Sequence, residues 1–254
     1  MHIFITGGTK GIGKGLVIEF LKKGHEVSFT GTSIESISLA EKDFSGTFSG
    51  YVCDVRDFNS IVKAKDEAVE KYNCIDIWIN NAGVDQERGV VSDLSPEGIK
   101  RVIDINVTGM INGTSVALKE MRGQNFGVVY NMEGLGSNNM MIPKTLIYSS
   151  SKRLLRYFSR ACNKELKQYK EIFVGTLSPG MVFTNLLLND SDKESLKISS
   201  ILGNKVDEVT PFLVDKMLKG KKKINWLTNR KIMWKFTKSL FVKNDITSIM
   251  DMKQ

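Results

Sequence analysis

The sequence contains little histidine and little cysteine. Its 254 residues include two histidines, His2 and His25, and three cysteines, Cys53, Cys74 and Cys162. Both histidines fall at the starts of predicted strands, which argues against a histidine-based catalytic triad and a histidine-rich metal site. The cysteines are odd in number and scattered, a spacing that suits neither a disulfide framework nor a zinc site. We therefore expect free thiols, no metal and no triad hydrolase.

Proline and low-complexity sequence are also scarce. Four prolines, 41% apolar and 25% charged residues are the composition of an ordinary globular protein rather than a disordered chain. The length suits one α/β domain, so we expect a single domain over residues 1–254. The chain opens on a strand-like run at residues 2–6, without the charged segment and long apolar stretch of a secretory leader. We accordingly expect a cytoplasmic protein.

The formal net charge of +8 would suit nucleic acid, an anionic membrane surface or an anionic cofactor. Much of the excess lies after Lys216. A nucleic-acid-binding domain would more often interleave basic residues with stacking aromatic side chains across its binding face. We therefore expect no nucleic-acid partner.

Short apolar, β-branched runs alternate along the chain with segments of helical spacing. Such alternation predicts a doubly wound parallel sheet of the Rossmann type, with helices on both faces. In sheets of this kind, ligands bind outside the carboxyl ends of the strands, so motifs that follow strands should converge there. The predicted strands cover residues 3–6, 27–30, 47–53, 75–80, 127–131, 172–177 and, last, the run 220–228.

A glycine-rich segment, Thr6-Gly7-Gly8-Thr9-Lys10-Gly11-Ile12-Gly13, directly follows the first predicted strand and precedes a helical pattern. Glycine lets the backbone turn tightly and approach a pyrophosphate, and the helix that follows directs its free N–H groups at the negative charge. A glycine-rich run alone could be a flexible turn. Its position between a strand and a helix predicts a dinucleotide site.

The spacing of Gly7, Gly11 and Gly13 resembles that of the short-chain dehydrogenase/reductase family. Segments similar to further family motifs follow in order, and the resemblance covers residues 2–187 and weakens beyond them. It implies an oxidoreductase that moves a hydride between a nicotinamide and a small-molecule carbonyl or alcohol. The further segments are Asn80-Asn81-Ala82-Gly83, Asn106-Val107-Thr108-Gly109, Tyr148-x-x-x-Lys152 and Ser178-Pro179-Gly180.

Tyr148 and Lys152 are four residues apart on a predicted helix, so their side chains project from one face. A nearby ammonium and the charge of an oxidised nicotinamide would favour the phenolate of Tyr148, which could then carry the proton that accompanies hydride transfer. The resemblance implies that Lys152 also holds the nicotinamide ribose and that Asn106 orders a water in a proton relay. Without the surrounding motifs, the pair would be an ordinary amphipathic surface feature.

One position departs from the family pattern. The serine that hydrogen-bonds the substrate oxygen belongs about thirteen residues before Tyr148, where this chain has Leu135, or Gly134 when counted from the preceding strand. Ser137 either replaces that serine or is a solvated loop residue. Because losing such a donor typically costs roughly 10²-fold or more in rate, the alternative to an enzyme is a weak or inactive dinucleotide-binding sensor or scaffold.

Two segments, residues 131–137 and 177–187, resemble the chlorophyll b reductase branch of the family. That branch reduces a formyl group on a chlorin ring, and its loop likewise lacks the usual serine while keeping the later one. The resemblance implies reduction of a carbonyl on a bulky or apolar substrate.

The end of the second predicted strand bears on the choice of nicotinamide. NAD-specific members carry an acidic residue there for the adenine ribose, whereas this chain has Gly31. Thr32, Ser33 and Lys10 offer donors and a positive charge to a 2′-phosphate, although Thr32 and Ser33 could instead cap the next helix and Lys10 could be solvated. We predict NADP(H), with NAD(H) as the alternative.

Asp54 resembles the family residue that contacts the adenine amino group, and Thr184 is a candidate ligand for the carboxamide or pyrophosphate. Each could instead be a helix cap. We expect the cofactor to contact Gly7, Thr9, Lys10, Gly11, Ile12, Gly13, Thr32, Ser33, Asp54, Val55, Asn81, Ala82, Gly83, Tyr148, Lys152, Pro179, Gly180, Val182 and Thr184.

The C-terminal third predicts two accessory segments, a polar substrate flap over residues 185–205 and a basic amphipathic segment over residues 229–254. The basic segment would suit an anionic membrane surface. We favour instead that its apolar face packs on the substrate pocket or on a second subunit. The family resemblance also implies a homodimer or homotetramer through the helices that carry Asn106 and Tyr148.

Overall fold

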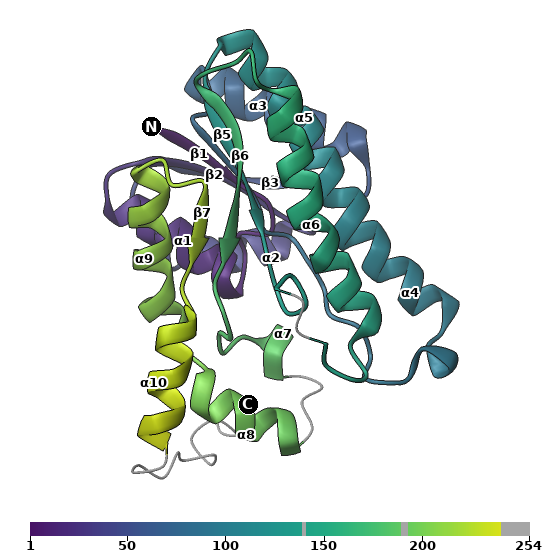
Figure 1. Cartoon of the computed structure of the whole chain (residues 1–254). Coiled ribbons are helices and arrows are strands. Elements are labelled where there is room, and N and C mark those ends of the chain that lie inside the picture. Colours follow the sequence, from purple (N-terminus) through teal and green to yellow (C-terminus); the bar gives the residue numbers. More distant parts are fainter. Residues whose placement is uncertain (139–140, 189–192, 240–254) are drawn as a thin grey trace.

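The computed structural model describes residues 1–138, 141–188 and 193–239 (Figure 1). Within them, seven parallel strands form one sheet in the order β3-β2-β1-β4-β5-β6-β7. The predicted doubly wound parallel sheet is confirmed, and every predicted strand overlaps an observed one. The strands are β1 (His2–Ile5), β2 (Glu26–Gly31), β3 (Phe48–Val52), β4 (Ile77–Asn80), β5 (Gly127–Met132), β6 (Ile172–Ser178) and β7 (Lys223–Asn225).

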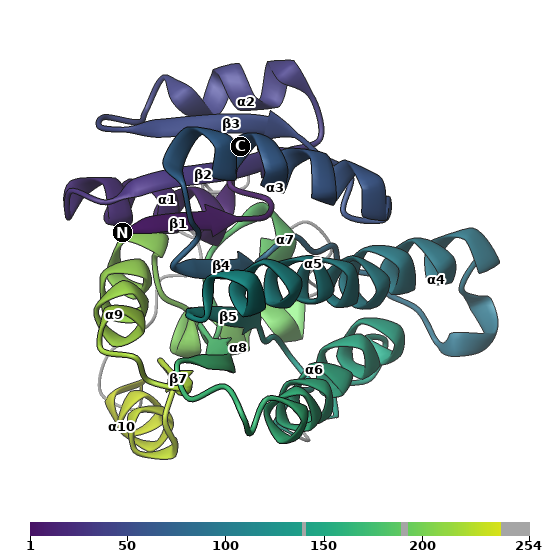
Figure 2. The ribbon, with the colours of Figure 1, turned by 90° about the horizontal axis from the view of Figure 1, so that it is seen from above.

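Helices cover both faces of the sheet. Figure 2 shows α5 (Gly109–Gln124) and α6 (Leu146–Glu165) on one side of the strands and α9 (Val206–Leu218) on the other. The remaining helices are α1 (Gly11–Lys22), α2 (Ile34–Glu41), α3 (Phe58–Tyr72), α4 (Pro96–Ile103), α7 (Asn185–Leu188), α8 (Lys193–Leu202) and α10 (Asn229–Ser239), with a short 3₁₀ turn at Val91–Asp93 and a π-helical turn at Asp104–Thr108.

The core consists of two apolar layers, one on each face of the sheet. Side chains alternate along β1, so Ile3 and Ile5 face the layer that contains Leu16 of α1, whereas Phe4 faces the opposite layer. In that opposite layer the rings of Phe4 and Trp78 stack 4.1 Å apart. Because the strands are apolar on both faces, they pack as the interior of a covered parallel sheet.

The strand order reverses between β1 and β4, which places a crevice at the carboxyl ends of the central strands. The loops after β1, β4, β5 and β6 carry the predicted motifs and meet at this end. Figure 1 shows α7, α8 and α10 on the same side of the sheet. Residues 189–192 of the predicted flap and residues 240–254 of the predicted basic segment lie outside the described residues.

No helix in the described part of the chain is both long and apolar enough to cross a membrane. Over the same residues, no three or more histidine, cysteine or acidic side chains gather as metal ligands would.

Candidate active site

The loop between β1 and α1 provides no side-chain cap for the N-terminus of α1. Lys10 occupies the N-cap position without a side-chain hydrogen bond to the helix, and the first turn of α1 carries no acidic residue. A side chain at Gly13 would collide with the carbonyl oxygen of Gly7 and with the amide of Asn81, so loop and helix pack backbone to backbone. Free N–H groups at the positive end of a helix dipole fit a pyrophosphate.

The loop after β4 is fastened to the same place. The hydroxyl oxygen of Thr6 accepts hydrogen bonds from the backbone N–H groups of Asn81 at 3.1 Å and Ala82 at 3.2 Å. The side-chain amide of Asn81 donates in return to the carbonyl oxygens of Thr6 at 3.1 Å and Gly7 at 2.9 Å. These bonds hold the glycine loop beside Gly83, which leads to the catalytic side chains.

The end of β2 is crowded by neighbouring side chains at Gly31, the position where an acid was expected for NAD. A Cβ atom at Gly31 would lie 2.6 Å from the Thr9 methyl group and 2.9 Å from the Ser36 hydroxyl. Ser33 caps α2, because its hydroxyl oxygen accepts the backbone N–H of Ser36 at 3.2 Å. The pKa of Glu35, in the first turn of α2, is lowered by its own backbone N–H and then by Ser33.

Asp54 follows β3, and its carboxylate is bound by Arg56 through two side-chain nitrogens, with Nη2 at 2.6 Å. This hydrogen bonding from Arg56 lowers the pKa of Asp54. Next to it, Val55 is buried against Gly109 at the start of α5, where a Cβ atom would lie 2.6 Å from a Val55 methyl group. Asp54 therefore stands at the cofactor end of the sheet as an acid already paired with an arginine.

Tyr148 and Lys152 lie one turn apart on α6, and both are buried. The ammonium of Lys152 donates a 3.2 Å hydrogen bond to the carbonyl oxygen of Met132, at the end of β5. It lies 5.8 Å from the centre of the Tyr148 ring. The backbone N–H of Tyr148 donates to the side-chain oxygen of Gln86 at 2.8 Å, so the loop after β4 also fixes the first turn of α6.

Asn106 approaches the same pair from the other side. Its side chain exchanges two 2.8 Å hydrogen bonds with the backbone of Val84 and donates to the Ser151 hydroxyl at 3.2 Å. A Cβ atom at Gly83 would lie 3.2 Å from the Asn106 oxygen and 3.4 Å from the Lys152 nitrogen. The structure thus brings Asn106, Lys152 and the Asn81 to Gly83 loop together.

Asn106 lies in the π-helical turn, not in the regular helix that the sequence analysis expected. A π turn inserts one extra residue, and such turns occur frequently at functional sites. Here the turn lies between α4 and α5 and carries Asn106, which is buried.

Burial shifts the pKa values of both candidate catalytic residues. It raises the pKa of Tyr148, with a smaller contribution from Asp85 in the same direction and an opposing one from Arg88. It lowers the pKa of Lys152 to about 8. In the protein by itself, burial thus favours the neutral phenol of Tyr148, the form that donates a proton. The expected phenolate depends also on the charge of an oxidised nicotinamide and stays a prediction.

Gly134 occupies the place that faces the Tyr148 hydroxyl, since a Cβ atom there would lie 2.5 Å from the phenol oxygen. Ser137 is buried in the same loop, and its hydroxyl donates to the Gly134 carbonyl at 2.6 Å, with the Glu133 carboxylate 3.3 Å away. Among the described residues, no hydrogen bond joins Ser137 to Tyr148. Ser137 was expected either to replace the family serine or to be a solvated loop residue. It is buried rather than solvated, and its hydroxyl turns towards the backbone of its own loop.

Thr184, in the loop after β6, reaches the glycine loop. A Cβ atom at Gly11 would lie 3.3 Å from the Thr184 methyl group, while the Thr184 hydroxyl lies 3.4 Å from the Val182 carbonyl oxygen. In the turn before it, Gly180 packs against Leu227, beyond β7. The loop after β6 thus closes the candidate cofactor site from the flap side.

Sequence reasoning missed the ion pair that anchors the loop after β5. The side chain of Glu133 has no exposed surface and receives two 2.8 Å hydrogen bonds from Arg156. Arg156 lies one helical turn after Lys152, so it extends the same face of α6. The signal in the sequence was an acidic residue directly after a buried strand. A buried charge of this kind needs a partner of opposite sign, which predicts an ion pair.

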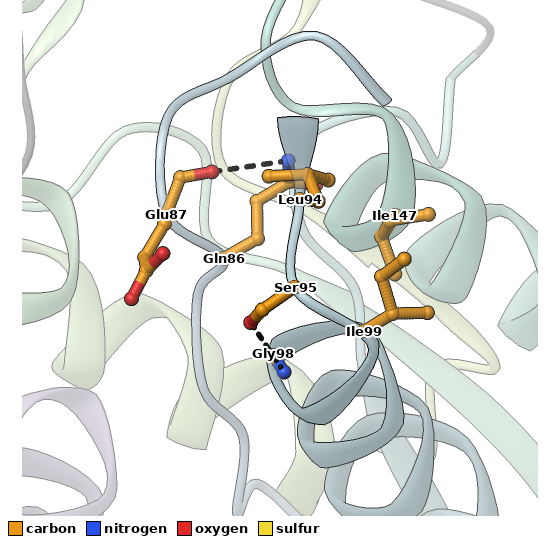
Figure 3. Close-up of a pocket in the computed structure, with 7 residues that line it drawn as sticks. All are labelled: Gln86, Glu87, Leu94, Ser95, Gly98, Ile99 and Ile147. Carbon is orange, nitrogen blue, oxygen red and sulfur yellow. Dashed lines mark hydrogen bonds between the residues drawn. The ribbon is translucent and has the colours of Figure 1, made fainter. Parts of the chain in front are cut away.

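A small hollow lies beside Gln86, between the loop after β4, α4 and α6 (Figure 3). Its volume is about 10 Å³, which is room for about one water molecule. Its lining includes Leu94, Ile99 and Ile147, and Gln86 within it supports Tyr148 from behind. The hollow is therefore part of the scaffold and is too small for a substrate.

A model of the short chain dehydrogenase family matches residues 1–195. The chain belongs to the short-chain dehydrogenase/reductase family. This short-chain dehydrogenase/reductase is 32% identical over 256 residues to a probable chlorophyll(ide) b reductase of Arabidopsis thaliana, covering 91% of this chain and 51% of that protein. It is 34% identical over 223 residues to a chlorophyll(ide) b reductase of Oryza sativa subsp. japonica, covering 84% of this chain and 65% of that protein.

This chain therefore spans about half to two thirds of the length of these two relatives. Among solved structures, a 3-ketoacyl-(acyl-carrier-protein) reductase from Brucella melitensis, complexed with NADH, matches with a TM-score of 0.80 at 20% identity. The match covers 91% of this chain and 98% of the other, and it shows the shared fold.

The expected cytoplasmic location is contradicted by the relatives. Four chlorophyll(ide) b reductases that match this chain, two from Arabidopsis thaliana and two from Oryza sativa subsp. japonica, are named as chloroplastic. The expectation was wrong because it weighed the cytoplasm only against the secretory route. That comparison does not separate the cytoplasm from an organelle.

Proposed function

We propose that this chain is an NADP(H)-dependent reductase that acts on a carbonyl group of a bulky, apolar substrate, with Tyr148 as the proton donor. The observation that carries the proposal is a buried, neutral phenol whose hydroxyl faces the side-chain-free position Gly134, with Lys152 one turn away. The two chlorophyll(ide) b reductases named above support both the reaction class and the size of the substrate.

In this proposal the bound nicotinamide supplies the hydride. Tyr148 donates the proton from its hydroxyl to the carbonyl oxygen of the substrate, and the missing side chain at Gly134 lets the phenol lie close to the loop after β5. Lys152 holds the nicotinamide ribose, and Asn106 orders a water of the proton relay. Asn106 also fixes the loop after β4 through its bonds to Val84.

We assign Ser137 a positioning role. Its hydroxyl is committed to the Gly134 carbonyl at 2.6 Å, so it shapes the loop that faces Tyr148 instead of touching the substrate. The cost of lacking a side-chain donor to the developing oxyanion, typically roughly 10²-fold, would fall on the rate of the chemical step. A slow enzyme is therefore consistent with the proposal.

The choice of NADP(H) rests on the end of β2. Gly31 stands where an acidic side chain would repel a 2′-phosphate, and Lys10, Thr32 and Ser33 offer a positive charge and hydroxyl donors to that phosphate. Glu35 opposes this choice, because its lowered pKa keeps a negative charge in the first turn of α2. A titration with both nucleotides decides between them.

The test combines binding and turnover. The purified protein is titrated with NADPH and NADH, and NADPH oxidation is followed with formyl-bearing chlorins and with other bulky aldehydes and ketones. We expect tighter binding of NADPH, and we expect Tyr148→Phe to keep that binding while turnover falls roughly 10²- to 10⁴-fold. NADPH binding without turnover of any carbonyl by the unaltered protein would contradict the reductase and favour the sensor.

A further inference from the structure

The helix α10 presents its large apolar side chains to solvent. Met233 is 71% exposed, Trp234 is 62% exposed and Phe236 is 43% exposed. No residue of α10 is buried. We expected this apolar face to pack on the substrate pocket or on a second subunit. Among the residues that the structure describes, none covers these three side chains, and packing on a second subunit stays a prediction.

The opposite, basic face of α10 holds the helix in this orientation. The ammonium of Lys235 donates hydrogen bonds to the carbonyl oxygens of Leu202 at 3.3 Å and Gly203 at 2.9 Å, and to the side-chain oxygen of Asn204 at 2.7 Å. These bonds satisfy carbonyl groups at the end of α8, where a cation is favourable. The inward lysine thus fixes Met233 and Trp234 on the outer side.

A second inward contact strengthens this orientation. The Lys231 nitrogen lies 3.5 Å from the centre of the Trp226 ring, just before α10, and 5.3 Å from that of Phe212 on α9. Cations over aromatic faces are attracted to them. Turning the apolar face inward would break both sets of lysine contacts, so its exposure is built into the packing.

Charge decides what could cover the exposed face. Arg230, Lys231, Lys235 and Lys238 are the charged residues of α10, and the helix contains no acidic residue. Lys231 and Lys235 point inward, whereas Arg230 and Lys238 are exposed. A symmetric contact with a second copy would bring these two exposed cations of each copy together, which is unfavourable because like charges repel. An anionic lipid surface offers negative charge to them and an apolar layer to the exposed apolar side chains.

We propose that α10 docks this chain on an anionic membrane surface. Met233, Trp234 and Phe236 insert among the lipid headgroups, and Arg230 and Lys238 contact the phosphates. Figure 1 shows α10 beside α8 on the side of the sheet where the strands end. Docking there would bring the carboxyl ends of the strands, where the candidate site lies, towards the lipid.

The first experiment measures co-sedimentation of the full chain with phosphatidylcholine vesicles, with and without phosphatidylglycerol. We expect binding to the anionic vesicles that weakens as salt is added. The triple variant Met233→Ser, Trp234→Ser, Phe236→Ser should bind these vesicles at least about tenfold more weakly, and Arg230→Gln with Lys238→Gln should reduce the dependence on salt.

The matched control changes exposed apolar residues elsewhere. Ile34 and Leu39 are also exposed on a helix, α2, which contains Glu35 and Glu41 instead of cations. The double variant Ile34→Ser, Leu39→Ser should bind anionic vesicles as the unaltered chain does. Equal loss of binding in both sets would indicate a general effect of surface hydrophobicity and overturn the assignment to α10.

Tryptophan fluorescence gives an independent readout. Trp78 is fully buried and Trp226 is half-buried, whereas Trp234 is exposed, so insertion should shift the emission of Trp234 to shorter wavelength. Trp234→Phe should keep vesicle binding and lose the shift. The proposal is overturned if the chain does not bind anionic vesicles. It is also overturned if the chain self-associates without binding vesicles and the triple variant loses this self-association. None of these measurements depends on catalysis, so they fail or succeed separately from the reductase.

Discussion

The two sides of the candidate site are built by different means. On the dinucleotide side, the packing leaves no space for a larger side chain, because the glycine loop packs backbone to backbone and a side chain at Gly13 would collide with Gly7. On the proton-donor side, the constraint is on charge, because Tyr148 and Lys152 are ionisable groups enclosed in the protein. Substitutions on the dinucleotide side should therefore act by steric collision. Substitutions on the proton-donor side should act by changing the cost of burying charge.

The largest expected effect comes from Lys152→Met. Removing the ammonium should lower NADPH-dependent turnover roughly 10²- to 10⁴-fold. It should also raise the melting temperature, because burying the charged form costs free energy, as the lowered pKa of about 8 indicates. Lys164→Met, an exposed position on the same helix, is the control and should change neither quantity.

The pH dependence of the unaltered protein follows from the same group. Lys152 is charged below about pH 8 when folded and below its ordinary pKa of 10.5 when unfolded. Between these values the unfolded chain binds more protons, so this group makes the free energy of unfolding rise with pH. Activity should fall as the pH passes about 8. An unchanged pH profile together with a lower melting temperature in Lys152→Met would contradict this account.

A smaller effect should follow from Gly13→Ala. Overpacking typically costs about 1–3 kcal/mol, so dinucleotide affinity should fall roughly 5- to 150-fold as the new methyl group pushes the loop from its position. Calorimetric titration with NADPH measures this loss. Gly123→Ala is the matched control, since a Cβ atom there meets nothing within 4 Å. It should leave affinity unchanged and stabilise α5 by about 0.5–1 kcal/mol. Equal affinities in the two variants would refute the steric account.

The smallest expected effect comes from Gly134→Ser, a position where both space and the catalytic phenol are concerned. Gly134→Ser restores a hydroxyl near the family's serine position, but its Cβ atom would lie 2.5 Å from the Tyr148 oxygen. We expect turnover to fall roughly tenfold because the new side chain displaces the phenol. A rate above that of the unaltered protein would show instead that the substrate oxygen lacked a donor.

Patterns that are local in the sequence predicted much of this molecule. The alternation of strands and helices, the glycine loop and the one-turn spacing of Tyr148 and Lys152 depend on neighbouring residues, so periodicity is enough to find them. The position facing Tyr148 depends instead on how the loop after β5 folds back against α6. Counting residues left Leu135 and Gly134 open, and only the structure selects Gly134.

The basic helix shows a second limit of pattern reading. Its amphipathic spacing predicts two faces but does not say which one turns inward. An apolar face usually packs on the body of a protein, and on that rule the expectation was reasonable. Here Lys235 finds the carbonyl groups at the end of α8, an arrangement that depends on where a distant helix ends. No spacing within α10 encodes that partner.

The ion pair between Glu133 and Arg156 has a consequence for how this enzyme could diverge. It fastens the loop that faces Tyr148 to the helix that carries Tyr148, and neither charge can be lost alone without leaving the other unpaired in a buried setting. A change at one of the two residues should therefore need a change at the other. The loop between them is constrained as well, because side chains at Gly134 and Gly136 would collide with Tyr148 and Ser149 on α6. Divergence at this place therefore has to move the loop and the helix together.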